Sequence, residues 1–168
     1  NFTEKQWFEK ISIDKIDESL VQNIDNSVFQ IKFISDEKKF LSVKYLQKNV
    51  TASDIEKLEK ISKYIAYFTA KSSNISNELI KGISNFENLV KLEIQENNID
   101  DESIKILQSL KNLEILNIHN TKITSKSIEI LKKFNNLKRA YVWGTSISKS
   151  EVDEFNRKEE KLKLIGGS

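Results

Sequence analysis

A repeat of 24 residues is the feature that most constrains how this chain can fold. Leu89, Leu113 and Leu137 stand 24 residues apart, and each opens the pattern Leu-x-x-apolar-x-apolar. One step of 24 residues back lies Ile65, and a further step of 25 reaches Phe40, each followed by apolar residues in the same places. Periods of about 20 to 50 residues are typical of solenoids, propellers and arrays. The pattern therefore predicts five stacked units.

Each unit combines a strand signal with a helix signal. When the opening residue is position 1, the apolar residues at positions 4 and 6 alternate, which predicts a short strand. Position 12 carries a good helix N-cap in every unit, namely Thr51, Ser76, Asp100, Thr124 and Ser148. Apolar residues at positions 16, 19 and 22 then form one face of about three helical turns. Because one such unit cannot bury its apolar side alone, the units must stack and share a core.

This arrangement is identified as a leucine-rich repeat, whose units are about 20 to 29 residues long. We expect an α/β fold: a right-handed solenoid of five repeats of about 24 residues, with a parallel sheet on the concave side and helices on the convex side. Position 9, where such repeats carry a ladder of asparagines, holds Lys48, Ser73, Asn97, Thr121 and Thr145. The ladder is therefore expected to consist mostly of hydroxyl groups.

The chain divides into three expected parts. Residues 1–39 would form an N-terminal cap, residues 40–155 the five repeats, and residues 156–168 a C-terminal cap and tail. The apolar patterns predict short helices over 6–11 and 17–24, a strand over 28–34, a last helix over 150–158 and a closing strand over 162–165. Residues 166–168, Gly-Gly-Ser, are expected to be loose.

Composition excludes several classes of function. The chain has no Cys, which removes disulfides, iron–sulfur clusters and thiolate-bound zinc, and no Gly-rich phosphate loop or nucleophile elbow is visible. The net charge is only +2, and Arg139 and Arg157 are the only arginines, so we expect no nucleic-acid binding. No apolar run reaches about 18 residues, so this segment is not expected to insert into a membrane. The absence of Met leads us to expect a fragment of a larger protein.

Three short tracts resemble one family of bacterial proteins. Residues 39–43, 120–124 and above all 140–148, which read Ala-Tyr-Val-Trp-Gly-Thr-Ser-Ile-Ser, are similar to the C-terminal leucine-rich domain of membrane-anchored proteins with a c-type cytochrome-like segment. The resemblance covers residues 28–155. It implies a periplasmic or envelope-side domain tethered through a missing upstream segment. The haem-attachment signature Cys-x-x-Cys-His is absent, so this chain is expected to hold no cofactor.

The side chains at positions 3, 5 and 7 should point to the inner face of the sheet. They are Ser42, Lys44 and Leu46; Tyr67, Thr69 and Lys71; Lys91, Glu93 and Gln95; Ile115, Asn117 and His119; and Arg139, Tyr141 and Trp143. Trp, Tyr and Arg are enriched at binding hot spots. We therefore predict a partner-binding patch formed by Lys91, Glu93, Asn117, His119, Arg139, Tyr141 and Trp143. Alternatively, Tyr141 and Trp143 pack against the C-terminal cap and seal the core.

The remaining polar residues do not predict catalysis. His119 is the only histidine, and Glu93 is the only acid expected near it, which makes a poor metal site. The acidic residues 100–102 fit a helix cap and first turn better than a calcium site. We therefore predict a non-enzymatic domain that presents its concave sheet to a protein, peptide or glycan in the bacterial envelope. The alternatives are a structural or assembly module that pairs through its first or last strand edge, and an accessory domain of an upstream redox protein.

Overall fold

The computed structural model describes residues 11–34, 37 and 39–168. All seven strands of this described part belong to one sheet, in chain order, in which β1 is antiparallel to β2 and every later strand runs parallel to its neighbour. The strands are β1 (Phe29–Phe33), β2 (Leu41–Tyr45), β3 (Ile65–Thr69), β4 (Lys91–Glu93), β5 (Ile115–Asn117), β6 (Arg139–Tyr141) and β7 (Lys163–Ile165). Lys91 lies opposite Ile115, which lies opposite Arg139. One repeat in sequence is thus one step across the sheet.

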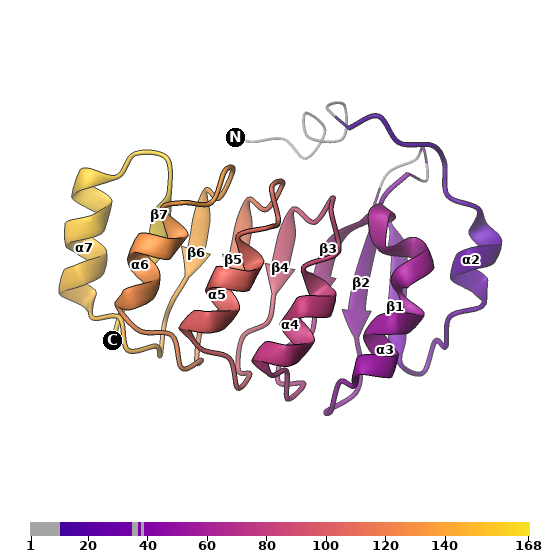
Figure 1. Ribbon diagram of the computed structural model, residues 1–168, viewed down its shortest axis with the longest axis horizontal. Coiled ribbons are helices and arrows are strands. Elements are labelled where there is room, and N and C mark those ends of the chain that lie inside the picture. Colours follow the sequence, from indigo (N-terminus) through magenta and orange to yellow (C-terminus); the bar gives the residue numbers. More distant parts are fainter. Residues whose placement is uncertain (1–10, 35–36, 38) are drawn as a thin grey trace.

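The helices of the repeats stand in a row on one side of this sheet (Figure 1). They are α3 (Ala52–Lys57) with the 3-10 helix η1 (Glu59–Tyr64), α4 (Asn77–Ile83), α5 (Asp101–Leu107), α6 (Lys126–Leu131) and α7 (Lys149–Lys158), and α2 (Glu18–Gln22) precedes β1. The structure confirms the predicted α/β solenoid with sheet and helices in separate layers.

In the part of the chain that the structure describes, no helix has the length and apolar character needed to cross a membrane.

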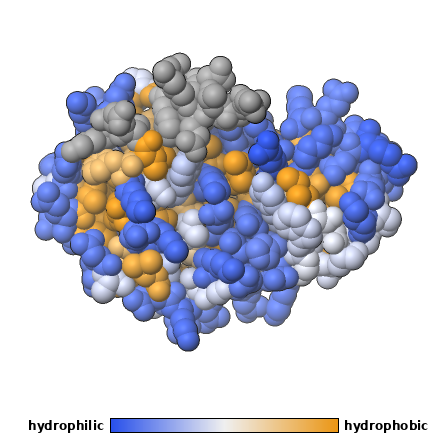
Figure 2. Space-filling view, turned by 180° about the vertical axis from the view of Figure 1, so that it is seen from behind, coloured by the Kyte–Doolittle hydropathy of each residue, from blue (hydrophilic) through white to orange (hydrophobic). Residues whose placement is uncertain are grey.

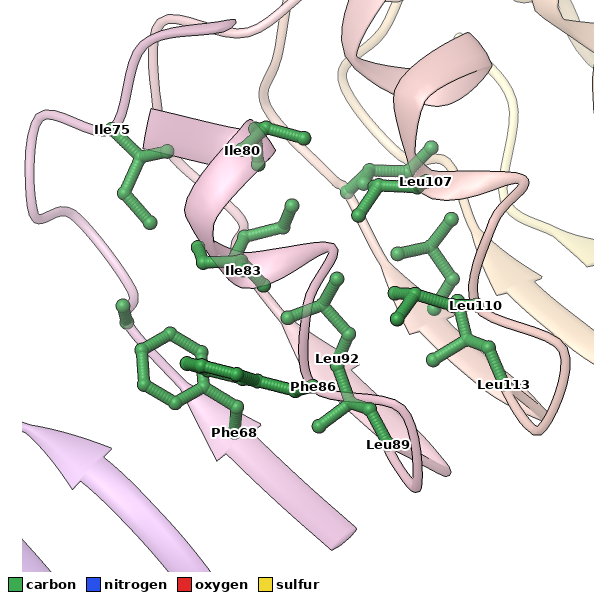
Figure 3. Packing of buried hydrophobic residues seen from close by; sticks show 14 of the residues in the cluster. Phe68, Ile75, Ile80, Ile83, Phe86, Leu89, Leu92, Leu107, Leu110 and Leu113 are labelled. Carbon is green, nitrogen blue, oxygen red and sulfur yellow. The ribbon is translucent and has the colours of Figure 1, made fainter. Parts of the chain in front are cut away.

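The core lies between the sheet and the helices (Figure 3). Phe68 and Leu92 reach it from the strands, and Ile80 and Ile83 reach it from α4; all four are completely buried. Phe86 meets Phe68 edge to face, with ring centroids 5.4 Å apart. The apolar residues at positions 4, 6, 16 and 19 are buried through the repeats, with Ile128 only partly so. The predicted periodicity is therefore the periodicity of the core.

The first repeat departs from the predicted register. The pairing of β2 with β3 shifts between Leu41 and Ser42, so that Leu41 lies opposite Ile65 and enters the main core. Phe40, which we expected in that place, joins a second small cluster with Ala66 and Val90, and Ile11 and Ile13 pack against it. The step from Phe40 to Ile65 is one residue longer than the other steps, and the irregular pairing absorbs that residue.

Among the side chains at position 9, that of Asn97 alone links neighbouring repeats in the described structure. Asn97 is buried, and its Oδ1 accepts hydrogen bonds from the backbone N–H groups of Ser73 (3.0 Å) and Ile75 (2.9 Å) of the preceding repeat. The hydroxyls of Thr121 and Thr145 instead donate to carbonyl groups of their own repeat, at 2.6 and 2.7 Å. The expected hydroxyl ladder therefore does not bridge neighbouring units.

A second polar column joins the beginnings of the helices. Asp101 accepts hydrogen bonds from the backbone N–H of Thr124 (2.9 Å) and from the hydroxyls of Thr124 and Ser127, all in the next repeat. The structure places the N-cap of helix α6 at Ser125 and not at the predicted Thr124, although the Thr124 hydroxyl still accepts the backbone N–H of Lys126 at 3.3 Å. Among the described residues, no group of three or more His, Cys, Asp or Glu side chains could hold a metal ion.

A third column uses the asparagines just before the strands. Each donates its amide N–H to a backbone carbonyl of the preceding repeat, at 2.7 to 3.0 Å: Asn88, Asn112 and Asn136. These residues recur every 24 positions in the sequence, directly before Leu89, Leu113 and Leu137. The sequence thus carried a ladder of asparagines, but at the opposite end of the strands from position 9.

The C-terminal end of the sheet is closed by side-chain and backbone contacts. Asn156 of α7 donates to the carbonyl of Leu164 (2.8 Å) and accepts from its N–H (3.0 Å). Ser168 donates its backbone N–H to Ile147 (3.0 Å), and its carbonyl accepts from Lys149 (3.0 Å). The expectation of a loose tail over 166–168 is wrong, because these hydrogen bonds hold it against the last repeat.

Candidate functional site on the open face of the sheet

The sheet face turned away from the helices, which we call the open face, carries the predicted patch. Side chains alternate between the two faces of a strand, so every second residue of β4, β5 and β6 points away from the core. Glu93, Asn117 and Tyr141 form one row across these strands. The structure places all the predicted residues on three neighbouring strands or directly after them: Lys91, Glu93, Asn117, His119, Arg139, Tyr141 and Trp143. Figure 2 shows this side of the molecule, where polar and apolar side chains are mixed.

An aromatic pair dominates the C-terminal end of the open face. The rings of Tyr141 and Trp143 are stacked, with centroids 5.7 Å apart and an angle of 28° between their planes. Trp143 is 47% exposed, one of the two large hydrophobic residues that remain exposed in the described part of the chain. Gly166 lies so close to the indole that a Cβ there would stand 2.8 Å from Cγ of Trp143. The tail thus supports the indole, which does not enter the core.

Glu96 is the acid that contacts His119, and the expectation that Glu93 has that role is wrong. Oε1 of Glu96 lies 3.3 Å from Nε2 of His119 and 3.1 Å from Nζ of Lys71, and Oε2 accepts from the hydroxyl of Ser72 at 2.5 Å. The hydrogen bonds from Ser72 and Lys71 lower the pKa of Glu96 to about 2. Glu93 pairs instead with Lys91, at 3.0 Å.

A backbone conformation explains why the sequence pattern missed Glu96. Position 8 has positive φ in four consecutive repeats: Ser72 (51°), Glu96 (59°), Asn120 (51°) and Gly144 (62°). A strand that ends in this conformation no longer alternates its side chains, so period 2 does not predict where Glu96 points. The recurrence of Ser, Asn and Gly at position 8 was the available signal, since Asn and Gly favour positive φ.

Gln95 behaves differently from its neighbours in the row. We expected it on the solvent-facing surface with Lys71 and His119, but it is only 8% exposed. Its Oε1 is buried and has no hydrogen-bond partner among the described residues. Lys71 and His119, which were expected in the same row, both bind the carboxylate of Glu96.

Charges on the open face are unevenly paired. The acid Glu114 pairs with Lys138 at 3.0 Å, as Glu93 does with Lys91 and Glu96 with Lys71. Arg139, Lys44 and Lys32 are exposed, and no ion pair involves them among the described residues. Lys163 does not add to this set, because its ammonium group binds the carbonyls of Asn156 and Glu159 at the end of α7. Within the described part of the chain, the open face therefore has three free cations and no free acid.

Comparisons with known proteins bear on the fold. No protein-family model matches the sequence. No curated protein matches it either. A solved structure that resembles it is an internalin from Listeria monocytogenes, with 20% sequence identity and a TM-score of 0.53 over 74% of this chain and 40% of that chain. The chain thus spans less than half of the internalin chain. No comparison supports a relationship to membrane-anchored cytochrome-like proteins, and that expectation stays a prediction. The likeness and the repeat geometry together show that this chain folds as a leucine-rich-repeat solenoid.

Proposed function

We propose that this chain is a non-catalytic binding domain whose open face contacts a protein or peptide partner. The observation that carries the proposal is the half-exposed Trp143, which stacks on Tyr141 at the end of the strand that also carries the unpaired Arg139. Residues of these three types are the ones most often found at the energetic centre of protein interfaces. The fold itself is compatible with many functions and does not decide between them.

The exposed part of Trp143 sets the scale of the expected binding energy. A Trp side chain contributes about 150–250 Å² of surface, so covering the half that is still exposed would remove about 100 Å² from water. At about 25 cal/mol per Å² this stabilises a complex by about 2.5 kcal/mol. Truncation of Trp143 to Ala should therefore weaken binding by about 60-fold.

Site-specific photocrosslinking tests the proposal. A photoreactive phenylalanine analogue would replace Tyr141 on the open face and, as a matched control, Arg157 on α7, which is exposed on the helical side. We expect crosslinks to one partner from position 141 but not from position 157, and we expect Trp143→Ala to abolish them. Crosslinking from both positions alike, or from neither, would contradict a binding role for the open face.

A structural module that assembles through its last strand is less well supported. The outward-facing N–H and C=O groups of Leu164 in β7 already bind the side chain of Asn156. A strand from another molecule would have to displace this amide before it could pair there. No observation favours an accessory role for a redox protein.

We also propose that the domain works on the envelope side of a bacterial cell. The support is the similarity of residues 140–148 to the envelope-side domain family. A fusion of the gene product to a reporter enzyme that is active only outside the cytoplasm tests the location. Activity of the reporter supports the envelope side, and its absence in cells that produce the fusion contradicts it.

A further inference from the structure

We infer that the partner presents an extended acidic peptide segment with an aromatic or large apolar side chain, and that this segment crosses the open face from β6 towards β2. The inference rests on the proposed function, because it assigns the chemistry of the partner of that same face. Three sets of observations carry it: the unpaired cations, the apolar positions between them, and the distance that separates them.

The first observation is the sign of the free charge. Each acid described on the open face is held by a lysine: Glu93 by Lys91, Glu96 by Lys71 and Glu114 by Lys138. Arg139, Lys44 and Lys32 remain without an acidic partner among the described residues. Because the acids described on this face are already paired with lysines, these three cations leave it with free positive charge. A partner that carries carboxylates would complement this face, and a basic one would be repelled.

The second observation is that apolar groups accompany the cations. Trp143 (47% exposed) follows β6, the strand that carries Arg139, and Leu46 (44% exposed) directly follows β2, the strand that carries Lys44. Ile115, half-buried on β5, lies opposite Arg139. A segment with only negative charge would leave these groups in contact with water. A peptide can combine carboxylates with apolar side chains, whereas a nucleic acid or a sulfated polysaccharide offers a uniform row of anions.

The third observation is the spacing of the free cations. Lys44 on β2 and Arg139 on β6 are separated by four strand-to-strand steps. At about 4.8 Å per step, and with Arg139 two residues out of register with Lys44, they stand about 20 Å apart. An extended peptide advances about 3.3 Å per residue, so about six residues connect two carboxylates at these positions. A segment of this length fits across the sheet without needing to fold.

Selection from a random library of 12-residue peptides tests the inference even while the partner is unidentified. The library would be selected on the wild-type chain, on Lys44→Ala/Arg139→Ala, and on the matched control Lys133→Ala/Arg157→Ala, which removes two exposed cations of the helical side. We expect the wild type and the control to enrich Asp and Glu together with an aromatic residue, and the open-face variant to lose this preference. Circular dichroism and thermal unfolding would establish that all three chains are folded.

Binding measurements on a selected peptide complete the test. By fluorescence anisotropy, Lys44→Ala/Arg139→Ala should weaken binding about tenfold or more, the control should stay within about twofold, and affinity should fall as salt rises. Enrichment of neutral or basic peptides, enrichment of nothing, or equal acidic selection by the open-face variant would overturn the inference. Heparin and a DNA duplex serve as competing polyanions. If either binds at physiological salt through Arg139 and Lys44 and displaces the peptide, the inference of a peptide partner is overturned in favour of a polyanion.

The outcome also separates this inference from the proposed function. If position 141 crosslinks to a partner whose contacting segment is neutral or basic, the acidic chemistry is wrong while the binding role of the open face stands. If position 141 gives no specific crosslink, the proposed function itself fails, whatever peptides the library yields.

Discussion

Replacement of Asn97 by Ala should be among the most destabilising substitutions in this chain. Oδ1 of Asn97 accepts the buried N–H groups of Ser73 and Ile75, and Nδ2 donates to three backbone carbonyls, among them that of Ala70 at 2.8 Å. Alanine would leave both N–H groups buried without a partner, and each such group costs about 1–3 kcal/mol. We therefore expect a loss of about 2–5 kcal/mol in the free energy of unfolding, which lowers the melting temperature by about 4–20 °C for a chain of this size.

Two matched variants make this prediction sharper. Thr121→Ala removes a single hydroxyl bond at the same position of the next repeat and should cost only about 1 kcal/mol. Asn97→Thr keeps a hydroxyl but cannot bind two N–H groups of the preceding repeat, so its loss should lie between the two. Urea unfolding gives the energies, and hydrogen exchange at the amides of Ser73 and Ile75 reports on the bonds themselves. A loss below about 1 kcal/mol for Asn97→Ala, or unchanged protection of those two amides, would refute the reasoning.

Three further predictions concern other contacts. Asp101→Ala removes the acceptor of one N–H and two hydroxyls and should lower the free energy of unfolding, measured in urea, by about 2–4 kcal/mol. Asp101→Asn should cost less, because Asn77 accepts the corresponding N–H and hydroxyl bonds one repeat earlier. Gly144→Ala should cost about 1–3 kcal/mol of the free energy of unfolding, since φ is +62° and the new Cβ would stand 1.9 Å from Oδ1 of Asn120. If Asn120→Gly in the same chain recovers none of this loss, the clash with Asn120 is not part of its cause. Because the folded pKa of Glu96 is about 2 and thus below its unfolded value of about 4.3, Glu96 stabilises the fold at neutral pH and loses this effect as the pH falls from about 4.5 to 2. The melting temperature of Glu96→Gln should therefore depend less on pH over that range than that of the wild type.

The architecture was predictable because one spacing governs both the sequence and the sheet. Leu89, Leu113 and Leu137 predicted the stacking of the repeats, and residues one repeat apart, such as Lys91 and Ile115, lie opposite each other in the sheet. Strand alternation was also sufficient to place Tyr141 and Arg139 on the open face. Whether those residues bind a partner stays a prediction.

The errors arose where a local conformation or a contact between repeats decides the outcome. Period 2 ends at position 8, where positive φ redirects Glu96 towards His119. The irregular pairing puts Leu41, and not Phe40, opposite Ile65. Because both residues are apolar and both are buried, their residue types could not show which of the two takes that place. Thr124 was the predicted N-cap by residue type, and its hydroxyl does accept the N–H of Lys126, but it also donates to Asp101 of the preceding repeat and the helix begins one residue later than predicted. Hydrogen bonds between neighbouring repeats depend on how close two loops come in space. The residue pattern within one repeat does not predict that distance.

The amide of Asn156 has a consequence for how chains of this kind change length. The three boundaries from β3 to β6 are built from the same register, so a duplicated 24-residue unit inserted at one of them would find matching partners on both sides. The boundary after β7 has no such freedom, because Asn156 occupies the hydrogen-bonding groups of Leu164 that another strand would need. Growth of the array by duplication is thus hindered at its C-terminal edge, and each unit added between β3 and β6 would widen the open face by about 4.8 Å while the last unit keeps its place at that edge.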